Sequence, residues 1–201
     1  MRPDKAFNIA ADSFGDYLKE LGNAAGVDIK DFDGLTAAFE QRFEFFASLG
    51  GRLSDHGLNS FHFVKVPEAE LNQILVKGQN NEELTAHDID AYATGLIEVL
   101  MRLNKKFDWT MQYHMNATRN ANKPMFKKIG ADAGFDSMGT QPDIAAQIME
   151  LLTDMQNEDN IPRTMLYSLN PNDWMQLATG MGDFYGGGVT QKNATGMCLV
   201  V

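Results

Sequence analysis

Short runs of β-forming residues alternate along this chain with longer runs that have the period of an amphipathic helix. The β-like runs predict strands at residues 52–58, 108–117 and 163–171. The helical runs predict helices at residues 32–49, 67–78, 85–106, 142–156 and 172–182. Thr85 and Asp88 form a candidate capping pair at the start of the longest helix. This alternation favours right-handed βαβ units around a parallel sheet, so the predicted fold class is α/β.

Charge and composition narrow the range of partners. The net charge is -10 and the isoelectric point is near 4.7, with no stripe of Lys and Arg, which argues against nucleic acid and against an anionic membrane surface. No run of about 18 apolar residues occurs, and the first residues, MRPDKAFN, do not resemble a signal peptide. We therefore expect a cytoplasmic protein that binds neither nucleic acid nor a membrane.

Candidate functional residues stand near the ends of the predicted strands, where parallel α/β proteins place their chemistry. Asp55 and His56 lie near the end of the first strand, His114 lies near the end of the second, and Arg119 follows the second. A histidine at such a position can be a metal ligand, a general acid or a general base, and an arginine can clamp a carboxylate. On spacing alone, either histidine could equally be a hydrogen-bonded residue of the core.

Five segments bear a closer likeness to a known family. In order, RPDKAFN, SDHGL, MQYHMNATRNAN, GADAGFDS and LYSLNPND resemble the middle of uronate isomerase (glucuronate isomerase), in the amidohydrolase superfamily. The resemblance runs from Arg2 to near Thr190. It implies a (β/α)8 TIM barrel that interconverts aldo- and keto-hexuronates, such as D-glucuronate with D-fructuronate and D-galacturonate with D-tagaturonate. Residues 1–192 would then be an incomplete barrel, roughly strands four to six with their helices.

The resemblance also assigns roles to individual residues. It makes Arg2 and Arg119 substrate-binding, and it places Asp55 and His56 at the end of the fourth strand and His114 at the end of the fifth, as catalytic residues. His114 would lie near a divalent metal, expected to be zinc, either as a ligand or as a group that handles protons. The family's His-x-His pair on the first strand and its aspartate on the eighth have no counterpart in this sequence. We therefore expect this chain to hold no metal and to be inactive alone.

The alternative to an enzyme fragment is a non-catalytic α/β module that binds sugar acids through Arg2 and Arg119. In either case, an unclosed barrel leaves strand edges and barrel-facing apolar side chains open to water. We therefore expect aggregation or loose packing when the chain is expressed alone.

The last residues, GGGVTQKNATGMCLVV, depart from the family pattern. Uronate isomerases continue after the glycine-rich turn with a seventh strand similar to Met-Gln-x-Gly-x-x-Trp-Trp-Phe. With one permitted set of codons, deleting a single base at Lys192 restores Lys-Met-Gln-Leu-Gly-Cys-Ala-Trp-Trp. Residues 193–201 are therefore interpreted as an out-of-frame tail, produced by a sequencing error or a gene lesion. The alternative is a natural C-terminal strand.

Overall fold

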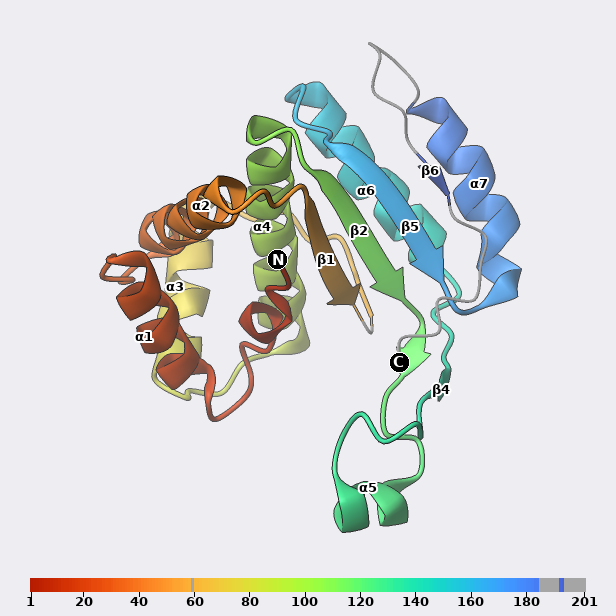
Figure 1. The fold of residues 1–201 in the computed structure, drawn as a ribbon, viewed down its shortest axis with the longest axis horizontal. Coiled ribbons are helices and arrows are strands. Elements are labelled where there is room, and N and C mark those ends of the chain that lie inside the picture. The colour runs from red at the N-terminus through yellow and green to blue at the C-terminus, as the bar shows by residue number, and fades with distance from the viewer. Residues whose placement is uncertain (59, 185–191, 194–201) are drawn as a thin grey trace.

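A computed structural model describes residues 1–58, 60–184 and 192–193 of the chain. It has an α/β fold around a four-stranded parallel sheet in the order β1-β2-β5-β6 (Figure 1). The strands are β1 (Leu53–Leu58), β2 (Thr110–Met115), β5 (Arg163–Ser168) and β6 (Lys192–Asn193). The three predicted strands are confirmed, and β6 adds a fourth. From Ala194 onward, the predicted out-of-frame tail lies outside the described residues.

Helices cover one face of the sheet and flank both of its edges. Figure 1 shows α4 and α6 behind the sheet, α1, α2 and α3 grouped beside β1, and α7 beside β6. The helices are η1 (Asp4–Phe7), α1 (Phe14–Ala25), α2 (Phe32–Ser48), α3 (Glu68–Gln79), α4 (Ala86–Lys106), α5 (Lys123–Ile129), α6 (Ile144–Asn157), η2 (Pro171–Asp173) and α7 (Trp174–Asp183). The five predicted helices are confirmed as α2, α3, α4, α6 and α7. None of the described helices combines the length and apolar composition that a membrane span requires.

Local side chains fix where the helices begin and end. The Thr85 hydroxyl accepts a hydrogen bond from the backbone N–H of Asp88, whose carboxylate accepts one from the backbone N–H of Thr85, so the predicted capping box is present at α4. Asp31 caps α2 in a similar way by accepting from the backbone N–H of Gly34 at 2.7 Å. Helix α1 ends at Gly26, whose φ of 70° is a conformation that favours glycine.

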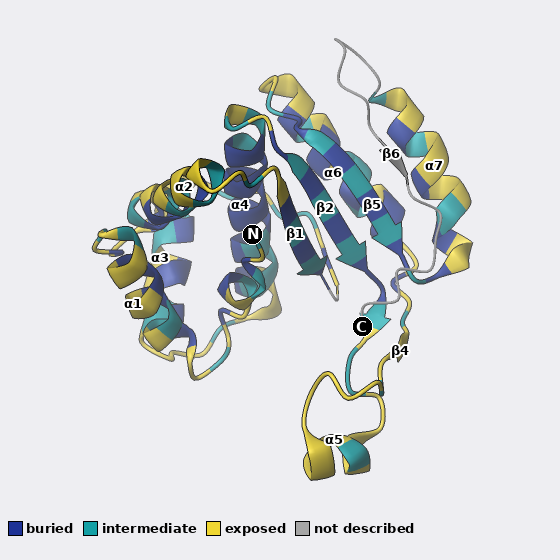
Figure 2. Ribbon diagram, viewed as in Figure 1, coloured by how far each residue is buried: buried dark blue, intermediate teal, exposed yellow. Residues whose placement is uncertain are grey.

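The two faces of the sheet differ in burial (Figure 2). Side chains alternate between faces along a strand, and every second residue of β1, β2 and β5 is buried under the helices. The remaining residues form the open face, defined here as Leu53, Asp55, Gly57, Thr110, Gln112, His114, Arg163, Met165 and Tyr167. This face is mainly polar, so it offers fewer apolar barrel-facing side chains than the sequence led us to expect. Aggregation of the chain stays a prediction, but fewer exposed apolar side chains on the open face support it.

Aromatic side chains form one end of the core, where α2 meets the start of β2. Trp109 is 1% exposed, and its ring centroid lies 4.8 Å from that of Phe43 and 6.5 Å from that of Phe107. A Cβ added to Gly51 would lie only 2.8 Å from the backbone oxygen of Phe46 and 3.0 Å from the Trp109 ring. A side chain at position 51 would therefore clash with the Phe46 carbonyl and with the indole, which explains the glycine there.

The segment between β1 and α3 is held by side chains rather than by a strand partner. Within residues 60–66, three backbone N–H groups donate to Gln141, Gln147 and Thr94 at 2.7–2.9 Å. Gln141 also donates to a carbonyl of the segment at 2.7 Å. These contacts satisfy backbone groups that would otherwise be buried without partners. They place the segment against α4 and α6.

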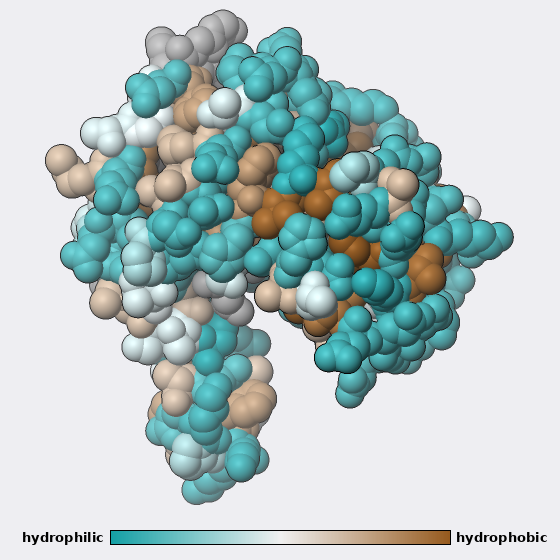
Figure 3. Space-filling model, turned by 180° about the vertical axis from the view of Figure 1, so that it is seen from behind, coloured by the Kyte–Doolittle hydropathy of each residue, from teal (hydrophilic) through white to brown (hydrophobic). Residues whose placement is uncertain are grey.

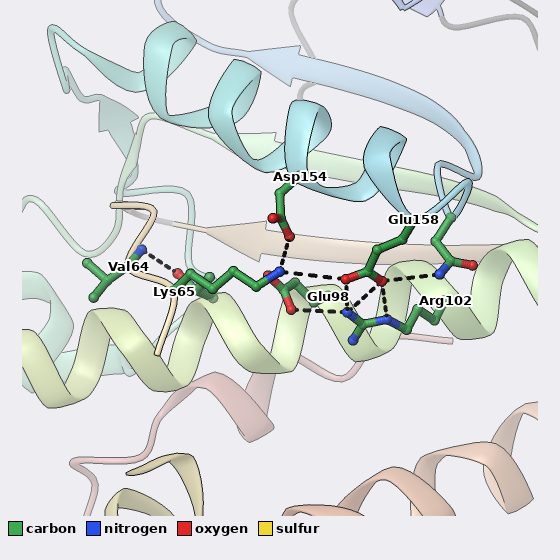
Figure 4. A network of polar contacts seen from close by, with 8 residues as sticks. Val64, Lys65, Glu98, Arg102, Asp154 and Glu158 are labelled. Carbon is green, nitrogen blue, oxygen red and sulfur yellow. Dashed lines mark hydrogen bonds and ion pairs between the residues drawn. The ribbon is translucent and has the colours of Figure 1, made fainter. Parts of the chain in front are cut away.

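An ion-pair network on the helix side of the molecule ties this segment to both helices (Figure 4). The Lys65 ammonium lies 2.5 Å from Asp154 on α6 and 3.7 Å from Glu98 on α4. Arg102 on α4 pairs with Glu98 at 3.3 Å and with Glu158 at 2.8 Å. Burial raises the pKa of Glu98, and the two cations offset this only in part. The network joins α4 to α6 away from the open face.

An arm of residues 117–138 extends beyond the carboxyl end of β2 and stands clear of the body (Figure 3). It contains α5 and a short antiparallel pair, β3 (Ala117–Thr118) and β4 (Ser137–Met138). No residue of α5 is buried. The arm therefore depends on contacts at its base for its position.

Candidate active site

Asp55 and His114 meet on the open face. The strand register places Gly57 opposite His114, so Asp55, two residues earlier on β1, is the diagonal neighbour of His114 on the same face. Asp55 Oδ1 lies 2.5 Å from His114 Nδ1. In the tautomer that carries its proton on Nδ1, beside this carboxylate, a neutral His114 ring keeps its lone pair on Nε2. That nitrogen can then accept a proton or bind a metal.

Arg2 joins the same cluster from the N-terminal segment. Its Nε lies 3.1 Å from Asp55 Oδ2 and its Nη2 lies 3.0 Å from Asp4 Oδ2. The other oxygen of Asp4 accepts a hydrogen bond from the backbone N–H of Gly57 at 3.1 Å. Asp4 therefore connects the Arg2 guanidinium to β1, a role that the sequence analysis did not assign.

Backbone contacts fix the position of Arg2 as well. The amino group of Met1 donates to the carbonyl of Leu53 at 3.0 Å, and the backbone N–H of Asp55 donates to the carbonyl of Met1 at 2.9 Å. Met1 therefore pairs with the edge of β1 in the manner of a neighbouring strand. The Arg2 side chain remains half exposed, at 50%.

The charges of the cluster support one another. Burial raises the pKa of the Asp55 carboxyl, but the hydrogen bond and charge of His114 and the charge of Arg2 lower it by more, so its pKa lies below the usual range. Asp55 is therefore ionised near neutral pH. The cluster therefore presents an ionised carboxylate beside the His114 ring.

His56, predicted to act beside Asp55, lies on the opposite face of the sheet. It is 0% exposed and its Nε2 lies 2.9 Å from the hydroxyl of Ser54, which donates to Asn104. Burial lowers the pKa of His56 to about 3. The structure does not bring this neutral histidine to the cluster, and its surroundings match the alternative reading of a hydrogen-bonded core residue.

Arg119, the second predicted substrate-binding arginine, lies at the base of the arm. Its Nη1 is 2.5 Å from Asp136 Oδ2, and Asp136 Oδ1 accepts from the backbone N–H of Asn120 at 2.9 Å. That backbone hydrogen bond lowers the pKa of Asp136, and the contact with Arg119 lowers it further by a smaller amount. Arg119 forms no described ion pair with Arg2, Asp55 or His114. Its described partner is the carboxylate that closes the arm.

The described donors do not make a complete metal site. Among residues 1–58, 60–184 and 192–193, no group of three His, Cys, Asp or Glu side chains is arranged to hold a metal ion. His114 and Asp55 could supply donors to such a site, but further ligands would have to come from elsewhere.

The sequence over this constellation matches a known family. A family model described as glucuronate isomerase matches residues 1–198. The chain belongs to the glucuronate isomerase family. The family match therefore covers every residue of the Arg2, Asp55 and His114 cluster as well as the arm.

Curated relatives carry the same family name. The chain is 54% identical over 192 residues to a uronate isomerase of Latilactobacillus sakei, covering 96% of this chain and 41% of that protein. It is 49% identical over 191 residues to a uronate isomerase of Lactococcus lactis, covering 95% of this chain and 40% of that protein. The chain thus spans about two fifths of the length of the glucuronate isomerase family members it matches.

Solved structures agree with the fold. The crystal structure of uronate isomerase from Thermotoga maritima matches with a TM-score of 0.81 at 27% identity, covering 89% of this chain and 39% of that one. The glucuronate isomerase of Caulobacter crescentus matches with a TM-score of 0.73 at 18% identity, which supports the fold alone.

Proposed function

We propose that this chain forms part of a uronate isomerase barrel, roughly strands four to six of a (β/α)8 fold, and carries part of its active site. The parallel strands with helices on one face support the barrel. The observation that carries the functional proposal is the Arg2, Asp55 and His114 cluster on the open face. It joins a half-exposed guanidinium to a histidine held by a carboxylate. Isomerising an acidic sugar calls for a cation that binds the carboxylate and for a group that moves a proton.

The chemistry of the proposed substrates fits these residues. Converting an aldohexuronate such as D-glucuronate or D-galacturonate to its keto form moves the C2 proton to C1 and the O2 hydroxyl proton to O1, through an enediol. His114, with Nδ1 donating to Asp55, would take up and return a proton at Nε2. Arg2 would bind the sugar carboxylate through N–H groups not donated to Asp4 and Asp55. Arg119 would assist if the Asp136 pair opened.

A divalent metal, expected to be zinc, would polarise the carbonyl and hydroxyl oxygens of the sugar. Because the described residues do not complete a metal site, the roles above are given to the chain's own side chains alone. His114 is the described residue that we propose to lie nearest the metal. We further infer that the chain alone holds no metal and does not turn over uronates.

Binding and turnover can be measured separately on the purified chain. We expect D-glucuronate to shift the NMR signals of Arg2 and His114, whereas D-glucose, which lacks the carboxylate, should leave them in place. Arg2→Met should abolish the glucuronate response, while Lys19→Met, at a lysine that pairs with Asp16 on the surface of α1, should retain it. No fructuronate should form.

Two outcomes would contradict these proposals. Equal responses to D-glucuronate and D-glucose would show that the cluster does not recognise the carboxylate of a uronate. Formation of fructuronate that stops on addition of a chelator would show that the chain is active alone.

A further inference from the structure

Tyr167 packs directly on the histidine of the candidate site. His114 on β2 and Tyr167 on β5 are register partners, and both project onto the open face. Their ring centroids lie 4.7 Å apart and the ring planes differ by 15°, a stacked arrangement. The stack restricts rotation of the imidazole out of its plane.

The phenol is itself held in place from the neighbouring strand. Its hydroxyl donates to Gln112 Oε1 at 3.0 Å and lies 3.3 Å from Met165 Sδ. Gln112 precedes His114 by two residues on β2, so the two side chains share the open face. Tyr167 is therefore fixed at its ring by His114 and at its hydroxyl by Gln112.

Asp55 and Tyr167 restrain different motions of His114. Asp55, on β1, contacts a single ring nitrogen at 2.5 Å, and a contact at one atom leaves the ring free to tilt about that atom. Tyr167, on β5, contacts the flat face of the ring and limits that tilt. Residues from three adjacent strands thus determine the orientation of one imidazole.

We propose that Tyr167, anchored by Gln112, is a positioning residue that holds the His114 ring with Nδ1 on Asp55. The inference rests on the proposed function for its consequence in catalysis, but the orientation itself concerns only side chains of this chain. Tyr167 differs from Tyr113, which lies under the helices at 1% exposure and belongs to the core. Packing of the core therefore does not explain a tyrosine on the open face.

The test follows the Nδ1–H proton of His114 by NMR in histidine-labelled chain, with the signal assigned from its loss in His114→Gln. A proton shared with a carboxylate at 2.5 Å should resonate far downfield and exchange slowly with water. We expect Tyr167→Leu, which removes the stack, to abolish this signal or move it upfield. Tyr167→Phe retains the ring but loses the hydrogen bond to Gln112, so the signal should persist and move upfield by less than in Tyr167→Leu.

Gln112→Leu provides a second, independent measurement. It removes the acceptor of the Tyr167 hydroxyl, and we expect the His114 signal to move upfield by less than in Tyr167→Leu. The inference is wrong if Tyr167→Leu has a folded amide spectrum and an unchanged His114 signal. If that variant does not fold, an unchanged signal in Gln112→Leu overturns it. Failure of D-glucuronate to bind would contradict the proposed function but not the orientation.

Discussion

Replacing Trp109 by alanine is expected to lower the free energy of unfolding by about 3–5 kcal/mol, the range for deleting a large buried aromatic side chain. The indole is 1% exposed and packs against Phe43 and Phe107 where α2 meets β2. Because domains of this size are stable by about 5–15 kcal/mol, a loss of this size is a substantial part of the total stability. Urea unfolding followed by circular dichroism measures the loss.

Met175→Ala is the matched control for this substitution. Met175 is a large apolar residue that is 77% exposed on α7, so its removal should change stability by no more than about 0.5 kcal/mol. Equal unfolding midpoints for the two variants would show that Trp109 does not pack as described.

Acidification is expected to destabilise the chain through His56. The buried ring stays neutral to about pH 3 in the folded state, whereas an unfolded histidine takes up a proton near pH 6.5. Between these values the unfolded state binds more protons, so stability is complete above about pH 6.5 and falls as the pH is lowered. The loss should approach about 1.4 kcal/mol per pH unit, or roughly 2 kcal/mol at pH 5.

The contribution of His56 can be isolated by comparing variants at pH 7 and pH 5. His56→Gln retains an N–H donor for Ser54 but cannot titrate, so its stability should fall less between the two pH values than that of the parent chain. His87→Gln, at a histidine paired with Glu70 on the surface, should follow the parent. Identical pH dependence in His56→Gln and the parent would contradict the buried neutral ring.

Much of the fold could be predicted because its signals are local. The β-forming runs and the spacing of apolar residues predict β1, β2 and β5 and five of the helices within a few residues. Helix α1 was missed although Phe14, Leu18 and Leu21 follow a helical period and Gly26 marks its end. Glycines inside the helix, including Gly22, obscured that pattern. Helix α5 has no buried face and left little periodicity to detect.

The candidate site depends on information that is not local. Asp55 meets His114 only because β1 and β2 pair in one register, which the sequence does not specify. The sequence could, however, have predicted that Asp55 and His56 lie on different faces of the sheet, because neighbouring residues of a strand project to opposite faces. Asp4, Gln112, Tyr167 and Asp136 were missed because their roles arise from contacts between elements.

Alternation along the strands also has an evolutionary consequence. In β2, Met111, Tyr113 and Met115 lie in the core, while Gln112 and His114 face the candidate site. One strand thus encodes two separable properties, and a change at an even-numbered position can alter chemistry with little effect on the core. Lineages with this sheet could therefore explore new substrates by substitution on one face while selection preserves the other.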